Sequence, residues 1–180
     1  MSYFYEYYNN QIVEDLKSEF DLKHIINVPK IKMISLNMGL GRDAVASSAA
    51  VESAARDLSL ITGQKPVVTT AKNSIASFQI RKGMKLGCKV TLRGKKMYEF
   101  LDNLVFIALP RIRDFQGFKK KSFDGNGNFS FGLSDQSIFP GVDYNKIDKF
   151  RGFNINIFTS TNSDQLSMEL LKRFHFPFNL

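Results

Sequence analysis

The segment Gly39-Leu40-Gly41-Arg42-Asp43-Ala44 has glycines at the spacing of a phosphate-binding turn. It lies between a predicted strand and a predicted helix, which is the context of the G-x-G-x-x-G/A motif in dinucleotide-binding folds. The next predicted strand, residues 66–70, ends without the acidic residue that would hold a ribose hydroxyl. We therefore favour a turn whose glycines let the chain approach a partner closely. A dinucleotide-binding enzyme is the alternative.

Residues 124–128 (DGNGN) resemble the opening of a calcium loop. The sixth loop position would be Phe129, where the sharp turn needs glycine, and the twelfth would be Asp135 rather than glutamate. A hairpin turn is the favoured interpretation.

Residues 151–158 (RGFNINIF) partly match the strand pattern of RNA-recognition domains. They keep the opening Arg-Gly-Phe and a final aromatic residue. Asn154 and Ile155 replace the central small and aromatic positions, which argues against base stacking there. We favour a core strand.

Residues suited to catalysis are few. His24 and His175 lie far apart in the sequence, and neither has neighbouring ligand residues. Cys88, the single cysteine, can form no internal disulfide, and its apolar strand predicts a buried thiol rather than a nucleophile. We expect no enzyme, no metal and no cofactor.

The positive charge of the chain is concentrated in one segment. Residues 58–98 contain no Asp or Glu, while the whole chain has a formal net charge of +8. Such a cluster is typical of proteins that bind a polyanion, so nucleic acid is the expected partner. The basic residues of this segment are Lys65, Lys72, Arg81, Lys82, Lys85, Lys89, Arg93, Lys95 and Lys96.

The chain has 180 residues, of which 43% are hydrophobic, enough to build a core. No apolar run approaches the roughly 20 residues that span a bilayer, and the first residues lack the pattern of a secretory signal. We expect no membrane contact.

Hydrophobic spacing predicts four helices. The first covers residues 3–20, with apolar residues every fourth position, and the second covers 44–61 and stops at Gly63. A third, around residues 97–108, is expected to end at Pro110. The last is expected to be capped by Ser163 and to end before Pro177.

Alternation predicts strands at residues 30–37, 66–70, 86–93, 129–131 and 153–157. In the first of these, Ile31 and Met33 are expected to face inward, and Leu36 is a further candidate. Residues 72–85 form a basic hairpin arm rather than a core element. These elements predict an α+β fold in a single domain over residues 1–180. Its mostly antiparallel sheet would have about five strands, with helices packed on one face.

Several short motifs occur in one order: residues 35–41 (SLNMGLG), 61–67 (ITGQKPV), 87–93 (GCKVTLR) and 109–115 (LPRIRDF). FDG with GN at 123–128, FP at 139–140 and RG at 151–152 follow them. Through these motifs the whole chain resembles the bacterial-type fifth large-subunit ribosomal protein, a family that binds 5S rRNA.

The resemblance implies a place in the central protuberance of the large ribosomal subunit. The partners implied are 5S rRNA, large-subunit rRNA, neighbouring proteins of the protuberance, tRNA in the peptidyl site and a protein of the small-subunit head. The ribosome could be that of a bacterial cytoplasm, a mitochondrial matrix or a plastid stroma.

The family's 5S rRNA contacts fall on Asn37, Gln64 and Thr91 here, beside the candidate phosphate ligands Lys65 and Arg93. In the arm, tRNA contacts are expected from Lys72, Arg81, Lys82 and Lys85. The bridge to the small subunit is expected near Arg111, Arg113, Asp143, Lys146 and Lys149.

The sequence departs from the family pattern at a few peripheral positions. Gln116 and Asn126 stand where basic residues are usual, and Gly141 stands where glutamate is common. These changes affect the expected rRNA or bridge contacts and leave the expected 5S rRNA residues intact.

Overall fold

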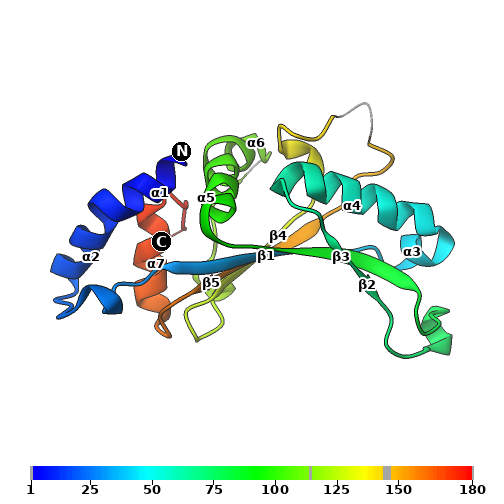
Figure 1. The fold of residues 1–180 in the computed structure, drawn as a ribbon, viewed down its shortest axis with the longest axis horizontal. Coiled ribbons are helices and arrows are strands. Elements are labelled where there is room, and N and C mark those ends of the chain that lie inside the picture. The colour runs from blue at the N-terminus through cyan, green and yellow to red at the C-terminus, as the bar shows by residue number, and fades with distance from the viewer. Residues whose placement is uncertain (1, 114, 144–146, 180) are drawn as a thin grey trace. The chain divides into compact units, whose positions relative to one another are not determined.

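The computed structural model describes residues 2–113, 115–143 and 147–179. Its five strands form one antiparallel sheet in the order β2-β3-β1-β5-β4 (Figure 1). The predicted α+β fold is confirmed. The strands are β1 (Ile31–Gly39), β2 (Val67–Thr70), β3 (Lys85–Leu92), β4 (Phe129–Leu133) and β5 (Phe153–Thr159).

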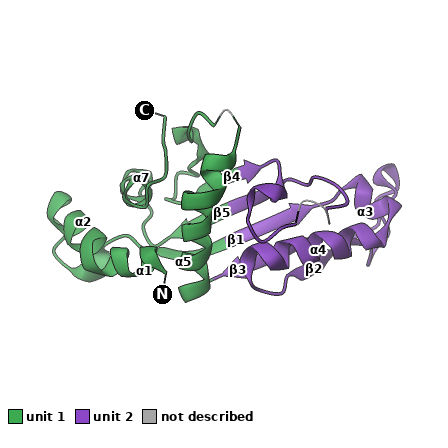
Figure 2. Ribbon diagram, turned by 90° about the horizontal axis from the view of Figure 1, so that it is seen from above, with its two compact units in different colours: residues 1–34, 93–131, 156–180 green, residues 35–92, 132–155 purple. Residues whose placement is uncertain are grey.

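The chain divides into two compact units (Figure 2). Unit 1 comprises Met1–Ile34, Arg93–Phe131 and Asn156–Leu180, and unit 2 comprises Ser35–Leu92 and Gly132–Ile155. The unit boundaries fall within β1, β4 and β5, so these three strands contribute residues to both units.

In unit 2, helix α4 (Ser48–Thr62) packs on β3. The buried side chains Val51, Ala54 and Leu58 of α4 meet a strand face on which Cys88 and Val90 are buried. Burial of these apolar surfaces stabilises the unit, because each removes hydrocarbon from water. Gly63 ends α4 with φ 62°, as its place in the sequence predicts.

The predicted helix over 44–61 is interrupted. A short helix, α3 (Arg42–Ala46), ends at Ser47, whose extended backbone (φ −150°, ψ 125°) precedes the first residue of α4. Serine favours this position at a helix start, and the preceding alanine spacing gave no sign of the break.

In unit 1, helices α1 (Tyr3–Tyr7) and α2 (Val13–Glu19) are joined by a π-helical turn, Tyr8–Ile12. Together they confirm the predicted helix over residues 3–20. Tyr8, Ile12 and Leu16 are buried as their spacing predicts. α1 packs against α5 (Gly94–Asn103).

The prediction that Pro110 ends the third helix is wrong. After α5 comes a π-helical turn, Leu104–Ala108, and then α6 (Leu109–Arg111), which contains Pro110. The π-helical turn interrupts the regular α-helical hydrogen bonding just before the proline. Pro110 therefore lies in the first turn of α6, where a missing backbone N–H is tolerated. The last helix, α7 (Asp164–Arg173), begins after Ser163, although the Ser163 side chain makes no cap hydrogen bond.

The predicted inward face of β1 is partly wrong. Ile31 and Leu36 are buried, but Met33 is only half-buried, and Ile34 and Met38 are buried in its place. The alternation of buried and exposed residues shifts by one position between Ile31 and Ile34. A strict period of two therefore cannot assign the inward-facing residues at both ends of the strand. No helix among the described residues is both long and apolar enough to cross a membrane.

Candidate nucleic-acid interface

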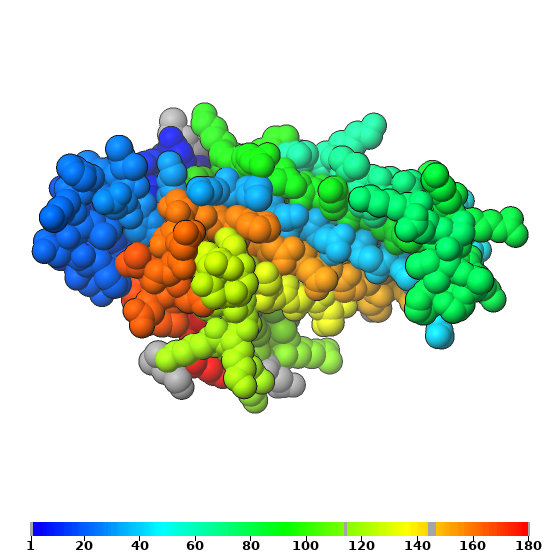
Figure 3. Space-filling view, turned by 90° about the horizontal axis from the view of Figure 1, so that it is seen from below, coloured from blue at the N-terminus to red at the C-terminus, as the bar shows by residue number. Residues whose placement is uncertain are grey.

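One face of the unit 2 strands is free of helices in the part of the chain that the structure describes. In β2 and β3, Val67 lies opposite Lys89 and Thr69 opposite Gly87, so these residues share a face. Figure 3 views this side, where β3, β1 and β5 form neighbouring green, light-blue and orange bands. We call this the polar face; its polar residues are Ser35, Asn37, Thr69, Lys89, Thr91 and Asn154.

On β1, β3 and β5 these polar residues alternate with buried apolar neighbours. Asn37 is exposed between the buried Leu36 and Met38, and Asn154 is exposed between the buried Phe153 and Ile155. Because successive side chains of a strand point to opposite faces, the apolar residues fill the core while the polar ones remain in water.

Gly87 allows β3 to lie very close to β1. A Cβ atom at this position would collide with the carbonyl oxygen of Met38 and lie 3.3 Å from the Cα of Gly39. Only glycine fits this close backbone approach.

Gln64 is positioned by the turn that follows α4. The Thr62 hydroxyl donates to the carbonyl oxygen of Leu58 (2.7 Å) and accepts from the Gln64 N–H (3.3 Å). The Gln64 side-chain Nε2 then donates to the backbone oxygen of Thr91 (3.2 Å). This hydrogen bond brings Gln64 and the end of β3 together and leaves the Gln64 Oε1 available as an acceptor.

Polar side chains on this face and at its end are available to a ligand. Within the described residues, Asn37, Thr91, Lys65 and Lys89 have no side-chain hydrogen bond or ion pair to another residue. Amide and hydroxyl groups can pair with ribose hydroxyls and base edges, and the two lysines can neutralise phosphates. The chemistry of the face therefore fits RNA.

Arg93 directly follows β3 but belongs to unit 1. Its Nη2 lies 3.2 Å from the Sδ of Met33, and the side chain is exposed. The guanidinium keeps its other N–H donors for an external acceptor.

The predicted arm is a hairpin between β2 and β3. Ala71 donates its N–H to the Met84 oxygen (2.8 Å), and Ile75 pairs with Ile80 nearer the tip. Lys72, Arg81 and Lys82 are exposed, and no carboxylate among the described residues pairs with them.

Lys85 differs from these three cations. It is the first residue of β3, at the base of the arm, and its Nζ lies 3.1 Å from a carboxylate oxygen of Glu52 on α4. Sequence reasoning could not separate it from the other arm cations, because Glu52 is distant in the chain.

The expected bridge residues fall into different units. Arg111 and Arg113 are in unit 1, whereas Asp143 and Lys149 are in unit 2, and Lys146 lies outside the described residues. The Lys149 Nζ bonds both carboxylate oxygens of Asp43 at 2.9 Å. This hydrogen-bonded cation lowers the pKa of Asp43.

The glycine turn at Gly39–Ala44 does not form a phosphate site. The α3 helix that follows has five residues, and the Asp43 N–H already bonds the Leu40 oxygen (3.0 Å). No cluster of three or more His, Cys, Asp or Glu side chains that could hold a metal occurs among the described residues. Cys88 is fully buried, and burial raises its pKa to about 11.

The calcium-like segment is a turn, as predicted. Asp124 accepts hydrogen bonds from the N–H groups of Asn126 (2.8 Å) and Asn128 (3.0 Å) and from the Asn128 side chain. These bonds lower the pKa of Asp124 and occupy its oxygens. In the RNA-recognition-like segment, Phe153 is buried, so its ring presents no stacking surface.

Sequence reasoning did not assign Ser35, Lys89 or Asn154 to the interface. The signal was present in the alternation of polar and apolar residues in β1, β3 and β5. Its use required the strand order, which places β1 between β3 and β5 although their sequence positions are far apart.

Two family models match the chain. The model of ribosomal protein L5 matches residues 24–81, and the model of the C-terminus of the same ribosomal family matches residues 85–178. The first covers β1 and β2, and the second covers β3 and β5, so all strands of the polar face fall within the matches. The chain therefore belongs to the ribosomal protein L5 family and is a structural, non-enzymatic constituent of the large ribosomal subunit that binds 5S rRNA.

Proposed function

We propose that the polar face is the surface that binds 5S rRNA. The observation that carries this proposal is the helix-free strand face on which Asn37 and Thr91 have unused hydrogen-bonding groups. Gln64 and Lys65 lie at the end of this face through the Gln64–Thr91 hydrogen bond. The short polar groups suit the wide, shallow minor groove of RNA, where 2′-hydroxyls are displayed.

The charge pattern supports the same proposal. Residues 58–98 contribute all of β2 and β3 and contain no carboxylate, so no like charge repels a phosphate from them. Lys65 and Lys89 provide the positive charge, while Asn37 and Thr91 provide hydrogen bonds that depend on shape. Phosphate contacts then position the RNA, and the uncharged groups define its register.

The test is the affinity of 5S rRNA for Asn37→Ala and Thr91→Ala. Each loses a hydrogen bond worth about 1 kcal/mol, so we expect affinity to fall about fivefold. Asn162→Ala, which changes another exposed asparagine, is the matched control and should bind normally. Unchanged affinity in both test variants, with melting curves like the parent, would remove these residues from the interface.

For the arm we propose contact with the tRNA in the peptidyl site. The support is the exposed set of Lys72, Arg81 and Lys82, which have no carboxylate partner among the described residues. Lys85 contributes less to this tRNA contact, because it already forms an ion pair with Glu52.

We also propose that the surfaces around Arg111 and Arg113, and around Asp143 and Lys149, take part in the bridge to the small-subunit head. The support is the exposed position of these four residues. Charge reversal at Arg113 should weaken subunit association, measured by sedimentation of reconstituted ribosomes. Association equal to that of the parent would exclude Arg113 from the bridge.

A further inference from the structure

The tip of the arm exposes apolar side chains within a basic segment. Phe78 is 68% exposed and Ile75 is 43% exposed. Single apolar residues on a surface are common. An aromatic ring at the end of a hairpin, three residues before Arg81 and four before Lys82, combines a flat apolar surface with positive charge.

Hydrogen bonds hold the backbone of the tip. Ile75 and Ile80 exchange two backbone bonds (2.8 and 3.1 Å), and a 3-10 turn, Ala76–Phe78, lies between them. Gln79 closes the turn in the left-handed region (φ 56°), with its N–H bonded to the Ala76 oxygen (3.0 Å). Phe78 is thus presented by an ordered turn, which reduces the entropy lost on binding.

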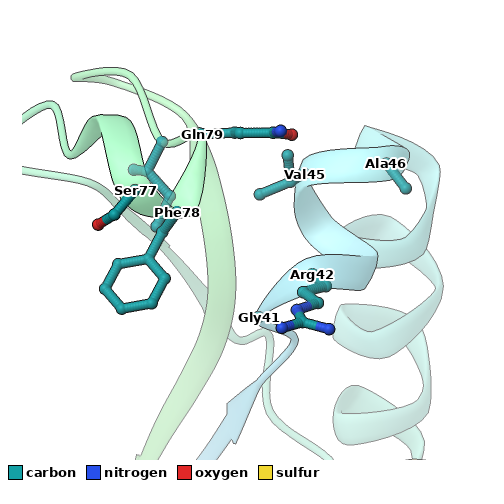
Figure 4. Close-up of a pocket in the computed structure, with 8 residues that line it drawn as sticks. Gly41, Arg42, Val45, Ala46, Ser77, Phe78 and Gln79 are labelled. Atoms are coloured by element: carbon teal, nitrogen blue, oxygen red, sulfur yellow. The ribbon is translucent and has the colours of Figure 1, made fainter.

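The Phe78 ring points away from the nearest helix. Figure 4 shows the ring turned away from α3, whereas the Gln79 side chain extends toward Val45. Between the tip and α3 lies an open pocket of about 890 Å³. Its lining residues are Gly41, Arg42, Val45 and Ala46 on the helix side and Ser77, Phe78, Gln79 and Ile80 on the arm side. Among the described residues, no aromatic ring packs on Phe78.

We propose that Phe78 stacks on an exposed base of the RNA that the arm meets, while Arg81 and Lys82 neutralise the neighbouring phosphates. This inference rests on the proposed RNA contact of the arm. Bases stack on aromatic rings whatever their sequence, and cations beside the ring hold the backbone. A partner protein would need acidic side chains placed beside these cations, whereas RNA supplies phosphates and flat bases together.

The chain contains no tryptophan, so Phe78→Trp introduces a single fluorescent reporter at the tip. The complex of the full chain with 5S rRNA is formed first, so that the polar face is occupied, and deacylated tRNA is then titrated. Stacking on a base should quench the fluorescence of the introduced indole. Phe106→Trp, at a residue that is 49% exposed in unit 1, is the control and should remain unquenched.

Affinity for tRNA separates stacking from simple apolar contact. Phe78→Ala and Phe78→Leu should each lower it about tenfold with an unchanged salt dependence, while Phe78→Trp should retain it. A Phe78→Leu protein that binds as tightly as the parent would overturn the stacking.

Arg81→Gln with Lys82→Gln tests the arm proposal itself. We expect weaker tRNA binding and a shallower dependence on salt. If this double variant keeps the tRNA affinity and the salt dependence of the parent, and the fluorescence of Phe78→Trp stays unquenched, the arm does not contact tRNA. If 5S rRNA quenches the fluorescence before any tRNA is added, Phe78 stacks on a base of 5S rRNA. That result would overturn the assignment of the arm to tRNA.

Discussion

The side-chain amide of Gln64 donates a hydrogen bond to the backbone oxygen of Thr91, which lies 27 residues further along the chain. The bond connects the turn after α4 with the last part of β3. Because it uses the Thr91 backbone, the Thr91 hydroxyl is left for a ligand. Two of the residues predicted to contact 5S rRNA, although remote in sequence, thereby lie together.

Gln64→Glu should weaken 5S rRNA binding by at least tenfold. The substitution removes the donor to Thr91 and places a negative charge in a segment that has none, so phosphates are repelled. Filter binding measures the affinity. Gln165→Glu, at an exposed position of α7 in unit 1, makes the same charge change in a residue that is not part of the polar face. Equal losses in the two variants would show that total charge, rather than position, controls binding.

Replacing Lys65 and Lys89 with glutamine should make 5S rRNA binding less dependent on salt. Each lost phosphate contact should reduce the slope of log affinity against log salt by about 0.7 to 0.9. Lys23→Gln with Lys30→Gln removes two exposed charges from unit 1 and should lower affinity less. A slope that stays at the parent value would mean that neither Lys65 nor Lys89 touches a phosphate.

Neutralising the arm should separate the two RNA surfaces. Lys72→Gln, Arg81→Gln and Lys82→Gln together should weaken tRNA contact severalfold and leave 5S rRNA affinity nearly unchanged. Lys85→Gln should have a smaller effect, because Glu52 already pairs with this lysine. Both affinities are measured on the same preparations. Equal losses of affinity for tRNA and 5S rRNA would show that the arm and the polar face bind RNA as one surface.

Local sequence signals predicted most elements of the fold. Tyr8, Ile12 and Leu16 repeat at helical spacing and are buried, and Gly63 ends α4 in the left-handed conformation that glycine favours. These outcomes depend on neighbours within a few residues. The change in the alternation of β1 beside Met33 cannot be predicted from such neighbours. It depends on which side chains the rest of the core can accept.

Contacts between distant segments could not be predicted. The Lys149–Asp43 pair joins residues 106 apart, and Lys85 meets Glu52 across 33 residues. The family resemblance predicted 5S rRNA contacts at Asn37, Gln64 and Thr91, and the strand order places Asn37 and Thr91 on the polar face. Asn154 was missed because its place beside the same face follows from the order of the strands.

Cys88 should be unreactive toward thiol reagents in the folded protein. Burial raises its pKa to about 11, so at pH 8 the thiolate fraction falls to about one in a thousand, from roughly a quarter for a free thiol of pKa about 8.5. Labelling with a chromogenic disulfide should therefore be slow in buffer and fast in denaturant.

The same shift links Cys88 to alkaline stability. Its folded pKa exceeds the unfolded value, so its contribution is present below about pH 8.5 and is lost as pH rises toward 11. Cys88→Ala should lose less stability than the parent over this range. Rapid labelling of the native protein at pH 8 would contradict the buried position of the thiol.

Gly87→Ala should destabilise the fold, because the added Cβ collides with the backbone oxygen of Met38. Forcing atoms into such a contact costs about 2 kcal/mol, and for a chain of this size that corresponds to a fall in Tm of about 6 °C. Thermal unfolding followed by circular dichroism measures the change. Gly39→Ala on the neighbouring strand is the matched control: a Cβ there would meet no atom within 4 Å, and its φ is not positive. Gly39→Ala should therefore shift stability by no more than about 0.5 kcal/mol. If the two variants melt together, β1 and β3 do not approach closely at Gly87, and the surface that presents Asn37 beside Thr91 is built differently.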